Sequence, residues 1–324
     1  MADLILLLLA EVMEARSWKL LPEDARRWVS ARLGEPLAFE PAEGGSAEVA
    51  GIARTCDDTY FLKAARVDSP CAGDLRIEAR VAGWRRAADA QRTQVLSPHL
   101  RLYGELGGWV VLCFDVAPGK QPGEPWDERE LGVVLATMDR LAADPQHSPS
   151  VELPSVCDRM RGRCSTWRQL QAHGRRDRVT LVELGEWERS ALSRLAAVEG
   201  RWEELVRGSS LLHFDPRHDN LRITHDQQVW FLDWGRACLG PAWVDPVCLL
   251  LESSIGDLDA DELFLSTELG AAADPAAVDA FLVVLASYWR HIALQPADAA
   301  EEWIRRRQQR SGDATIRWLR KRWS

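Results

Sequence analysis

The sequence predicts an α+β protein with a small β-rich lobe followed by a larger and mostly helical lobe. The chain has 324 residues, of which 46% are hydrophobic, so it is longer than a usual single domain and can fill two cores. Short extended segments dominate its first part, and helical periodicity dominates the rest. A Pro- and Gly-rich stretch at 115–125 interrupts both patterns. We therefore expect the lobes at residues 1–113 and 114–324.

The elements of the first lobe follow from charge placement, turns and apolar spacing. Residues 22–33 carry acidic residues early and arginines late and stop before Gly34, as a short helix does. Asp57 and Asp58 separate two extended runs, which is typical of a hairpin. The expected elements are a helix over 22–33, strands within 36–66, a helix over 74–90 and a strand over 109–114.

Apolar residues recur at helical spacing through most of the second lobe. The exception is 211–232, where two short β runs flank the polar segment 225–228 and predict a small hairpin. Helices are expected over 127–143, 155–172, 183–207, 244–253, 276–293 and 298–321.

The composition argues against several classes of function. A net charge of −9 lacks the basic excess that a phosphate backbone requires, so no nucleic-acid partner is expected. The apolar run at residues 4–10 is too short to span a bilayer and lacks a basic flank, so neither a membrane partner nor a targeting segment is expected. The seven cysteines contain no C-x-x-C spacing, which favours a reducing compartment, the cytoplasm, over a disulfide framework or a zinc site.

The segment from His213 to Asn220, followed by Asp233, carries the strongest chemical signal. Phosphoryl transfer needs an oriented hydroxyl, a carboxylate that accepts its proton, and a divalent metal that neutralises the phosphates. Asp215, Asn220 and Asp233 can supply these functions, and their hard oxygen donors suit magnesium. A histidine beside an aspartate could fall in a polar hairpin by chance, but the full spacing argues against chance.

This spacing resembles the aminoglycoside phosphotransferase and choline kinase superfamily, in which a catalytic loop H-x-D-x-x-x-x-N precedes a metal-binding Asp. The resemblance implies a bilobal, protein kinase-like fold and the use of ATP or GTP together with Mg²⁺. It also implies residue roles in this chain. Asp215 is then the catalytic base, Asn220 and Asp233 are magnesium ligands, and His213 organises the loop.

The first lobe supplies candidate nucleotide-binding residues. Lysine occurs at only four positions, and one of them, Lys63, ends a predicted β run, while Glu78 lies on the following helix. A strand lysine paired with a helix glutamate is how kinase-like folds hold the α and β phosphates. The turn with Gly45 and Ser46 takes the place of the loop over the nucleotide, although alone it would be an ordinary hairpin. By the resemblance, the backbone from Leu112 to Phe114 hydrogen-bonds the purine.

The sequence favours an enzyme, an O-phosphotransferase that modifies a hydroxyl of a small molecule. The Ala- and Arg-rich, Lys-poor composition suggests a GC-rich source in which resistance enzymes are frequent. An antibiotic of aminoglycoside, cyclic-peptide or nucleoside type is therefore the expected acceptor. The alternative is a metabolic kinase for choline, ethanolamine, a sugar or a homoserine-like alcohol. A non-catalytic nucleotide-binding scaffold is disfavoured, because degraded kinases lose the lysine, base or metal aspartate that this chain retains. The sequence indicates no oligomeric state.

Three further features surround the catalytic segment. The chain departs from the commoner loop, which has glycine at two positions, at Phe214 and Asp219. Asp245 matches an aspartate that follows the metal motif, and we expect it to brace the loop. The basic tail at 305–323 is expected to pack as a terminal helix rather than to contact a membrane or RNA. An acidic set either receives amines of the acceptor or is simply solvated; it comprises Glu252, Asp257, Asp259, Asp261 and Glu262.

Overall fold

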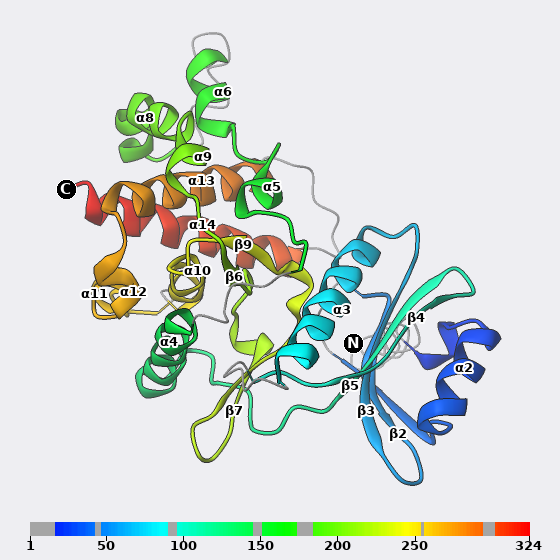
Figure 1. The fold of residues 1–324 in the computed structure, drawn as a ribbon. Coiled ribbons are helices and arrows are strands. Elements are labelled where there is room, and N and C mark those ends of the chain that lie inside the picture. The colour runs from blue at the N-terminus through cyan, green and yellow to red at the C-terminus, as the bar shows by residue number, and fades with distance from the viewer. Residues whose placement is uncertain are drawn as a thin grey trace, which may run out of the picture. The chain divides into compact units, whose positions relative to one another are not determined.

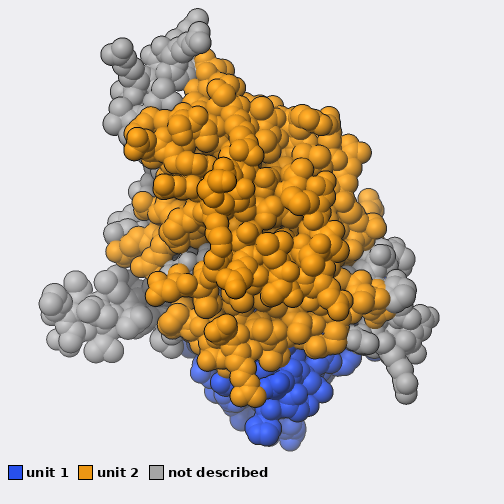
Figure 2. Space-filling model, turned by 90° about the vertical axis from the view of Figure 1, so that its left-hand side faces the viewer, with its two compact units in different colours: residues 1–121, 219–237 blue, residues 122–218, 238–324 orange. Residues whose placement is uncertain are grey.

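The described part of the chain divides into two units. The computed structural model describes residues 17–42, 47–89, 96–144, 151–173, 184–253, 256–293 and 302–324. Unit 1 is formed by residues 1–121 and 219–237, and unit 2 by residues 122–218 and 238–324 (Figure 2). The chain therefore passes from one unit to the other after residues 121, 218 and 237. The functional lobe boundary expected after residue 113 stays a prediction.

Unit 1 is built around a five-stranded antiparallel sheet with the strand order β1-β2-β3-β5-β4 (Figure 1). A second sheet pairs two short strands across the turn that the sequence predicts at 225–228. The strands are β1 (Ala38–Pro41), β2 (Val49–Arg54), β3 (Thr59–Arg66), β4 (Leu100–Leu106), β5 (Trp109–Asp115), β7 (Leu221–Ile223) and β8 (Val229–Phe231).

The alternation of side chains along β5 gives the large sheet two apolar faces. The odd-numbered residues from 109 to 113 share a core with η1 (Trp18–Leu20) and α2 (Glu23–Leu33). The even-numbered residues from 110 to 114 share a second core with α3 (Pro70–Asp89). Successive side chains of a strand point to opposite faces, so each helix covers one face of the sheet (Figure 1).

In the residues that the structure describes, the regular elements of unit 2 are helices and one short antiparallel pair, β6 (Ser210–Leu212) with β9 (Cys238–Gly240). The helices α13 and α14 lie side by side within it (Figure 1). The helices are α4 (Glu128–Ala143), α5 (Val156–Met160), α6 (Thr166–His173), α8 (Glu186–Glu199), α9 (Trp202–Leu205), α10 (Val244–Ser253), α11 (Ala260–Leu265), α12 (Glu268–Ala272), α13 (Pro275–Ala293) and α14 (Glu302–Arg322). The predicted α+β class is confirmed.

Two of the helices predicted for this unit are wrong as continuous elements. The segment 155–172 contains α5 and α6, and Gly162 between them has a φ of 77°, which an α-helix does not allow. The segment 183–207 contains α8 and α9, which are separated at Gly200. The predictions for α2, α4, α10 and α13 are confirmed to within two residues. In the described ranges, no helix has both the length and the apolar character needed to cross a bilayer.

Candidate active site

Lys63 and Glu78 form a buried ion pair on one face of the large sheet. Lys63 lies on β3, opposite Ala50 on β2 and Leu112 on β5, and its side chain projects toward α3, which carries Glu78. The Lys63 Nζ lies 3.0 Å from Glu78 Oε1 and 3.1 Å from Oε2. Lys63 is 9% exposed and Glu78 is 4% exposed. The predicted pairing is confirmed, and the pair is shielded from water, which strengthens its attraction.

Asp233 brings a second carboxylate to the same ammonium group. It immediately precedes the short helix η4 (Trp234–Arg236), in the left-handed conformation with a φ of 61°. Its Oδ1 accepts a hydrogen bond from Lys63 Nζ at 2.7 Å. Burial disfavours the charge of Lys63, but the carboxylates of Asp233 and Glu78 outweigh this effect and raise the pKa of Lys63. One cation between two carboxylates leaves the cluster with a net negative charge when both are ionised.

Asn220 and Asp233 lie at the same end of the β7–β8 hairpin. The last ladder pair joins Leu221 to Phe231, and beyond it the Leu232 N–H donates to the Asn220 carbonyl at 2.8 Å. The hairpin therefore brings two residues that are thirteen positions apart to one edge of unit 1. In the described part of the chain, no three His, Cys, Asp or Glu side chains are grouped as a metal site of their own. A carboxylate and an amide oxygen nevertheless match the way in which Mg²⁺ is shared between one or two protein ligands, water and phosphates.

The loop that carries Asp215 belongs to unit 2 and follows β6. The backbone N–H groups of His213 and Phe214 donate to Asp245 at 2.7 and 2.8 Å. Asp245 lies at the start of α10, so this carboxylate ties the loop to the helix, and the predicted bracing role is confirmed. The Asp215 N–H donates to His213 Nδ1 at 3.3 Å, which fits the expectation that His213 organises the loop.

Phe214 occupies the position where the commoner loop has glycine, and it retains a glycine-like backbone. Its φ is 64°, in the left-handed region that a bulky side chain rarely adopts. Its ring packs against that of Phe281, with the centroids 6.5 Å apart, and Phe281 contacts Trp243 at 5.8 Å. Strain of this kind costs on the order of 1–3 kcal/mol and persists only where the surroundings fix it. Here the aromatic packing and the Asp245 hydrogen bonds fix it.

Burial of Asp245 has a consequence for the pH dependence of stability. Burial raises the pKa of this carboxyl from its usual 3.8 to about 7, although the His213 and Phe214 N–H groups act to lower it. Between these values the folded state keeps a proton that the unfolded state has released. Stability is therefore expected to fall as pH rises from about 4 to about 7, by on the order of 1 kcal/mol per pH unit from this group.

The Asp245→Asn protein should show a flatter dependence over this window, because the substituted residue carries no titrating group. Urea unfolding of the parent and the variant at several pH values between 4 and 7 measures the difference. Parallel pH curves for the two proteins would contradict the raised pKa.

The other predicted nucleotide-binding residues make no side-chain contribution to these clusters that the structure describes. Leu112 and Phe114 lie inside β5, whose backbone pairs with β3 on one side and β4 on the other. Their backbone hydrogen-bonding groups therefore lie within the sheet ladders, and purine binding there stays a prediction. Gly45 and Ser46 lie outside the described residues. Lys63, Glu78, Asn220 and Asp233 belong to unit 1, and His213 and Asp215 belong to unit 2.

Two residues between Asp215 and Asn220 were not singled out from the sequence, Arg217 and His218. Arg217 Nε lies 3.2 Å from Asp215 Oδ1, so a cation neighbours the expected base. His218 is 8% exposed and contacts Glu252. Their position in the sequence, between Asp215 and Asn220, could have indicated that they lie near the site, because residues of a short loop must lie close to its ends.

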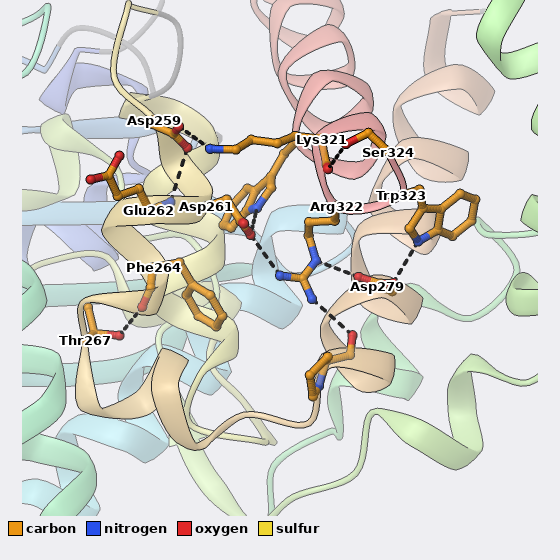
Figure 3. A network of polar contacts seen from close by, with 12 residues as sticks. Asp259, Asp261, Glu262, Phe264, Thr267, Asp279, Lys321, Arg322, Trp323 and Ser324 are labelled. Carbon is orange, nitrogen blue, oxygen red and sulfur yellow. Dashed lines mark hydrogen bonds and ion pairs between the residues drawn. The ribbon is translucent and has the colours of Figure 1, made fainter.

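Asp259 and Asp261, two members of the acidic set, contact the C-terminal end of α14 (Figure 3). Arg322 donates to Asp261 at 2.8 Å and to Asp279 at 2.6 Å. Lys321 forms an ion pair with Asp259, which caps the start of α11. The predicted terminal helix is therefore confirmed as packed within unit 2. Asp259 and Asp261 serve this packing rather than standing open to an amine.

The sheet with its Lys–Glu pair, followed by a helical unit, defines a protein kinase-like phosphotransferase fold, and solved structures of such enzymes share it. The chain matches a choline kinase, LicA, from Streptococcus pneumoniae with a TM-score of 0.54 and 14% identity, covering 91% of this chain and 98% of that one. It matches a mutant of the aminoglycoside phosphotransferase APH(4)-Ia in complex with AMP-PNP and hygromycin B with a TM-score of 0.57 and 14% identity, covering 92% and 99%. It matches the GDP and kanamycin complex of APH(2")-IIia with a TM-score of 0.55 and 12% identity, covering 93% and 98%.

The sequence also matches a family model over residues 39–281, that of the phosphotransferase enzyme family, APH. The chain belongs to this family. A search of curated proteins found no significant match. The predicted superfamily and the predicted class of enzyme, a small-molecule phosphotransferase, are thereby confirmed.

Proposed function

We propose that this protein transfers the γ-phosphoryl group of ATP or GTP to a hydroxyl of a small molecule. The observation that carries the proposal is the buried Lys63–Glu78 pair, whose ammonium also binds the partly exposed Asp233. Burying the charges of Lys63 and Glu78 is costly, and a protein that needed only stability would gain as much from apolar residues of similar volume. The carboxylates fix the position of the Lys63 ammonium, and this positive charge can bind nucleotide phosphates. Asn220 and Asp233 offer oxygen atoms at the nearby end of the β7–β8 hairpin.

Different residues of the chain have different roles in this proposed reaction. Glu78 holds Lys63 so that its ammonium contacts the nucleotide phosphates. Asn220 and Asp233 would hold Mg²⁺, which when bound supplies positive charge to the phosphates. Asp215 accepts the proton of the attacking hydroxyl, and His213 keeps the Asp215 backbone in place through its Nδ1.

We infer that the acceptor is an antibiotic, and that phosphorylation protects a cell by placing a dianion where the drug contacts its target. The related structures with hygromycin B and with kanamycin support an antibiotic acceptor. They contain AMP-PNP and GDP respectively, which supports both adenine and guanine nucleotides as candidates. Such an enzyme would act in the cytoplasm.

A metabolic kinase is the second candidate, and the likeness to a choline kinase favours it. In that case the acceptor is an amino alcohol, a sugar or a homoserine-like alcohol. Expression in a strain that lacks such a kinase separates the two, because a metabolic enzyme restores growth and a resistance enzyme raises drug tolerance.

The proposed reaction is tested with a panel of antibiotics and metabolites. The protein is incubated with Mg²⁺, ATP or GTP and each compound, and products are examined for the mass of one added phosphoryl group. One compound that gains this mass, at a rate proportional to enzyme concentration, is the expected result. If the protein binds nucleotide but modifies no member of a wide panel, the non-catalytic scaffold replaces the proposal.

A further inference from the structure

Helix α10 contacts the catalytic loop at a second point, beyond the Asp245 contacts. The His218 N–H donates to Glu252 Oε2 at 3.1 Å, and His218 Nδ1 lies 3.0 Å from Glu252 Oε1. The His218 and Glu252 side chains are each 10% exposed. The second ring nitrogen of His218 lies 3.2 Å from Glu124. A carboxylate that binds both the backbone and the side chain of one residue fixes that residue's position and its orientation.

The two anchors are spaced so that they act on opposite ends of the loop. Asp245 and Glu252 are seven residues apart on α10, which is about two turns or about 10 Å along one helix face. Asp245 holds the loop at His213 and Phe214, and Glu252 holds it at His218. The residues between these points, 215–217, belong to no helix or strand. The segment that carries Asp215 is therefore hydrogen-bonded to α10 on both sides.

We infer that Glu252 is a positioning residue for catalysis, which acts through His218 to hold the loop that carries Asp215. The inference rests on the proposed role of Asp215 as the base. An alternative from the sequence is that Glu252 receives an amine of the acceptor. Both of its carboxylate oxygens contact His218, which assigns it to the loop instead. Misplacement of a catalytic group by about 1 Å can cost ~10²-fold in rate.

The test compares Glu252→Ala and Glu252→Gln in the full-length protein. Glutamine keeps the shape of the side chain, its amide oxygen can accept the His218 N–H, and its NH₂ can donate to a neutral Nδ1. Glu252→Ala is expected to lower kcat by about 10–100-fold with little change in the KM of nucleotide or acceptor. Glu252→Gln is expected to recover most of kcat. Glu203→Ala, which removes an exposed glutamate of α9, is the matched control and should behave as the parent.

Hydrogen exchange of the loop amides is a second measurement, and it requires no acceptor. In Glu252→Ala, the amide of Asp215 is expected to exchange at least about tenfold faster, in addition to that of His218, because local opening of the loop exposes both. Exchange that changes at His218 alone would overturn the inference, as would a kcat that is unchanged in Glu252→Ala or equally low in Glu252→Gln. If the parent phosphorylates nothing, the proposed function fails, and the exchange at Asp215 still decides whether Glu252 holds the loop.

Discussion

The Asp215→Asn protein is expected to lose ~10²–10⁴-fold in kcat, because an amide cannot accept the proton of the attacking hydroxyl. The substitution keeps the size of the side chain, and the Asp215 N–H can still donate to His213 Nδ1. Nucleotide affinity should remain close to that of the parent, since the candidate ligands are Lys63 for the phosphates and Asn220 and Asp233 for Mg²⁺. The measurement is steady-state kinetics with an acceptor from the panel, together with nucleotide binding by calorimetry.

A matched control is Asp226→Asn, which removes an exposed carboxylate from the turn between β7 and β8. This variant should retain the parent's kcat. If Asp215→Asn and Asp226→Asn turned over the acceptor at similar rates, Asp215 would not be the base. If Asp215→Asn lost nucleotide binding together with activity, the loss would reflect misfolding, and circular dichroism would show it.

The second large effect concerns stability and comes from the last turn of α14. Arg322 and its partners Asp261 and Asp279 have side chains that are 10%, 15% and 21% exposed. Replacing Arg322 by alanine leaves two mostly buried carboxylates without their cation (Figure 3). We expect Arg322→Ala to lower the free energy of unfolding by about 3 kcal/mol, since breaking a buried charge network in this way is strongly destabilising. Urea unfolding followed by hydrogen exchange of α13 and α14 measures it.

The neighbouring Lys321→Ala substitution serves as the control. Lys321 pairs with Asp259, but its side chain is 51% exposed, and exposed ion pairs contribute little. Its unfolding curve should overlay that of the parent. An unfolding curve for Arg322→Ala that matches the parent's would contradict the importance assigned to the network. If both variants lost the same free energy of unfolding, the cause would be the positive charge at the end of α14 and not the buried network.

Patterns that repeat within one element were predictable from the sequence. The helices α4 and α13 have continuous periodicity, α2 has ordered charges and a stop at Gly34, and the structure has all three near the predicted bounds. The break at Gly162 was not predictable, because the apolar spacing continues on both sides of it. The short helices α11 and α12 were missed for a related reason. Each is too short to show a period, and their stability comes from contacts with α10, α14 and α4.

The residues of the candidate site likewise fall into those that local sequence patterns predicted and those that only tertiary packing brings together. Asp215, Asn220 and Asp233 were found because the chemistry requires a fixed local spacing. Lys63 and Glu78 were found because a strand and the next helix form one local unit. The contact between His218 and Glu252 joins residues 34 positions apart and follows no local pattern, since it depends on how the loop is laid along α10. The pairing of Arg322 with Asp261 is likewise set by tertiary packing alone.

The interrupted path of the chain through unit 1 limits how the protein can be divided or recombined. A fragment ending at residue 121 would lack residues 219–237, and with them the Asp233 partner of Lys63 and the Trp234 ring that lies 5.8 Å from Arg85. Such a fragment would leave part of its interior uncovered and should be a poor candidate for independent expression. A chimera with a related enzyme would therefore have to exchange residues 1–121 and 219–237 together. A single crossover between them would combine one part of unit 1 with the other part from a different protein.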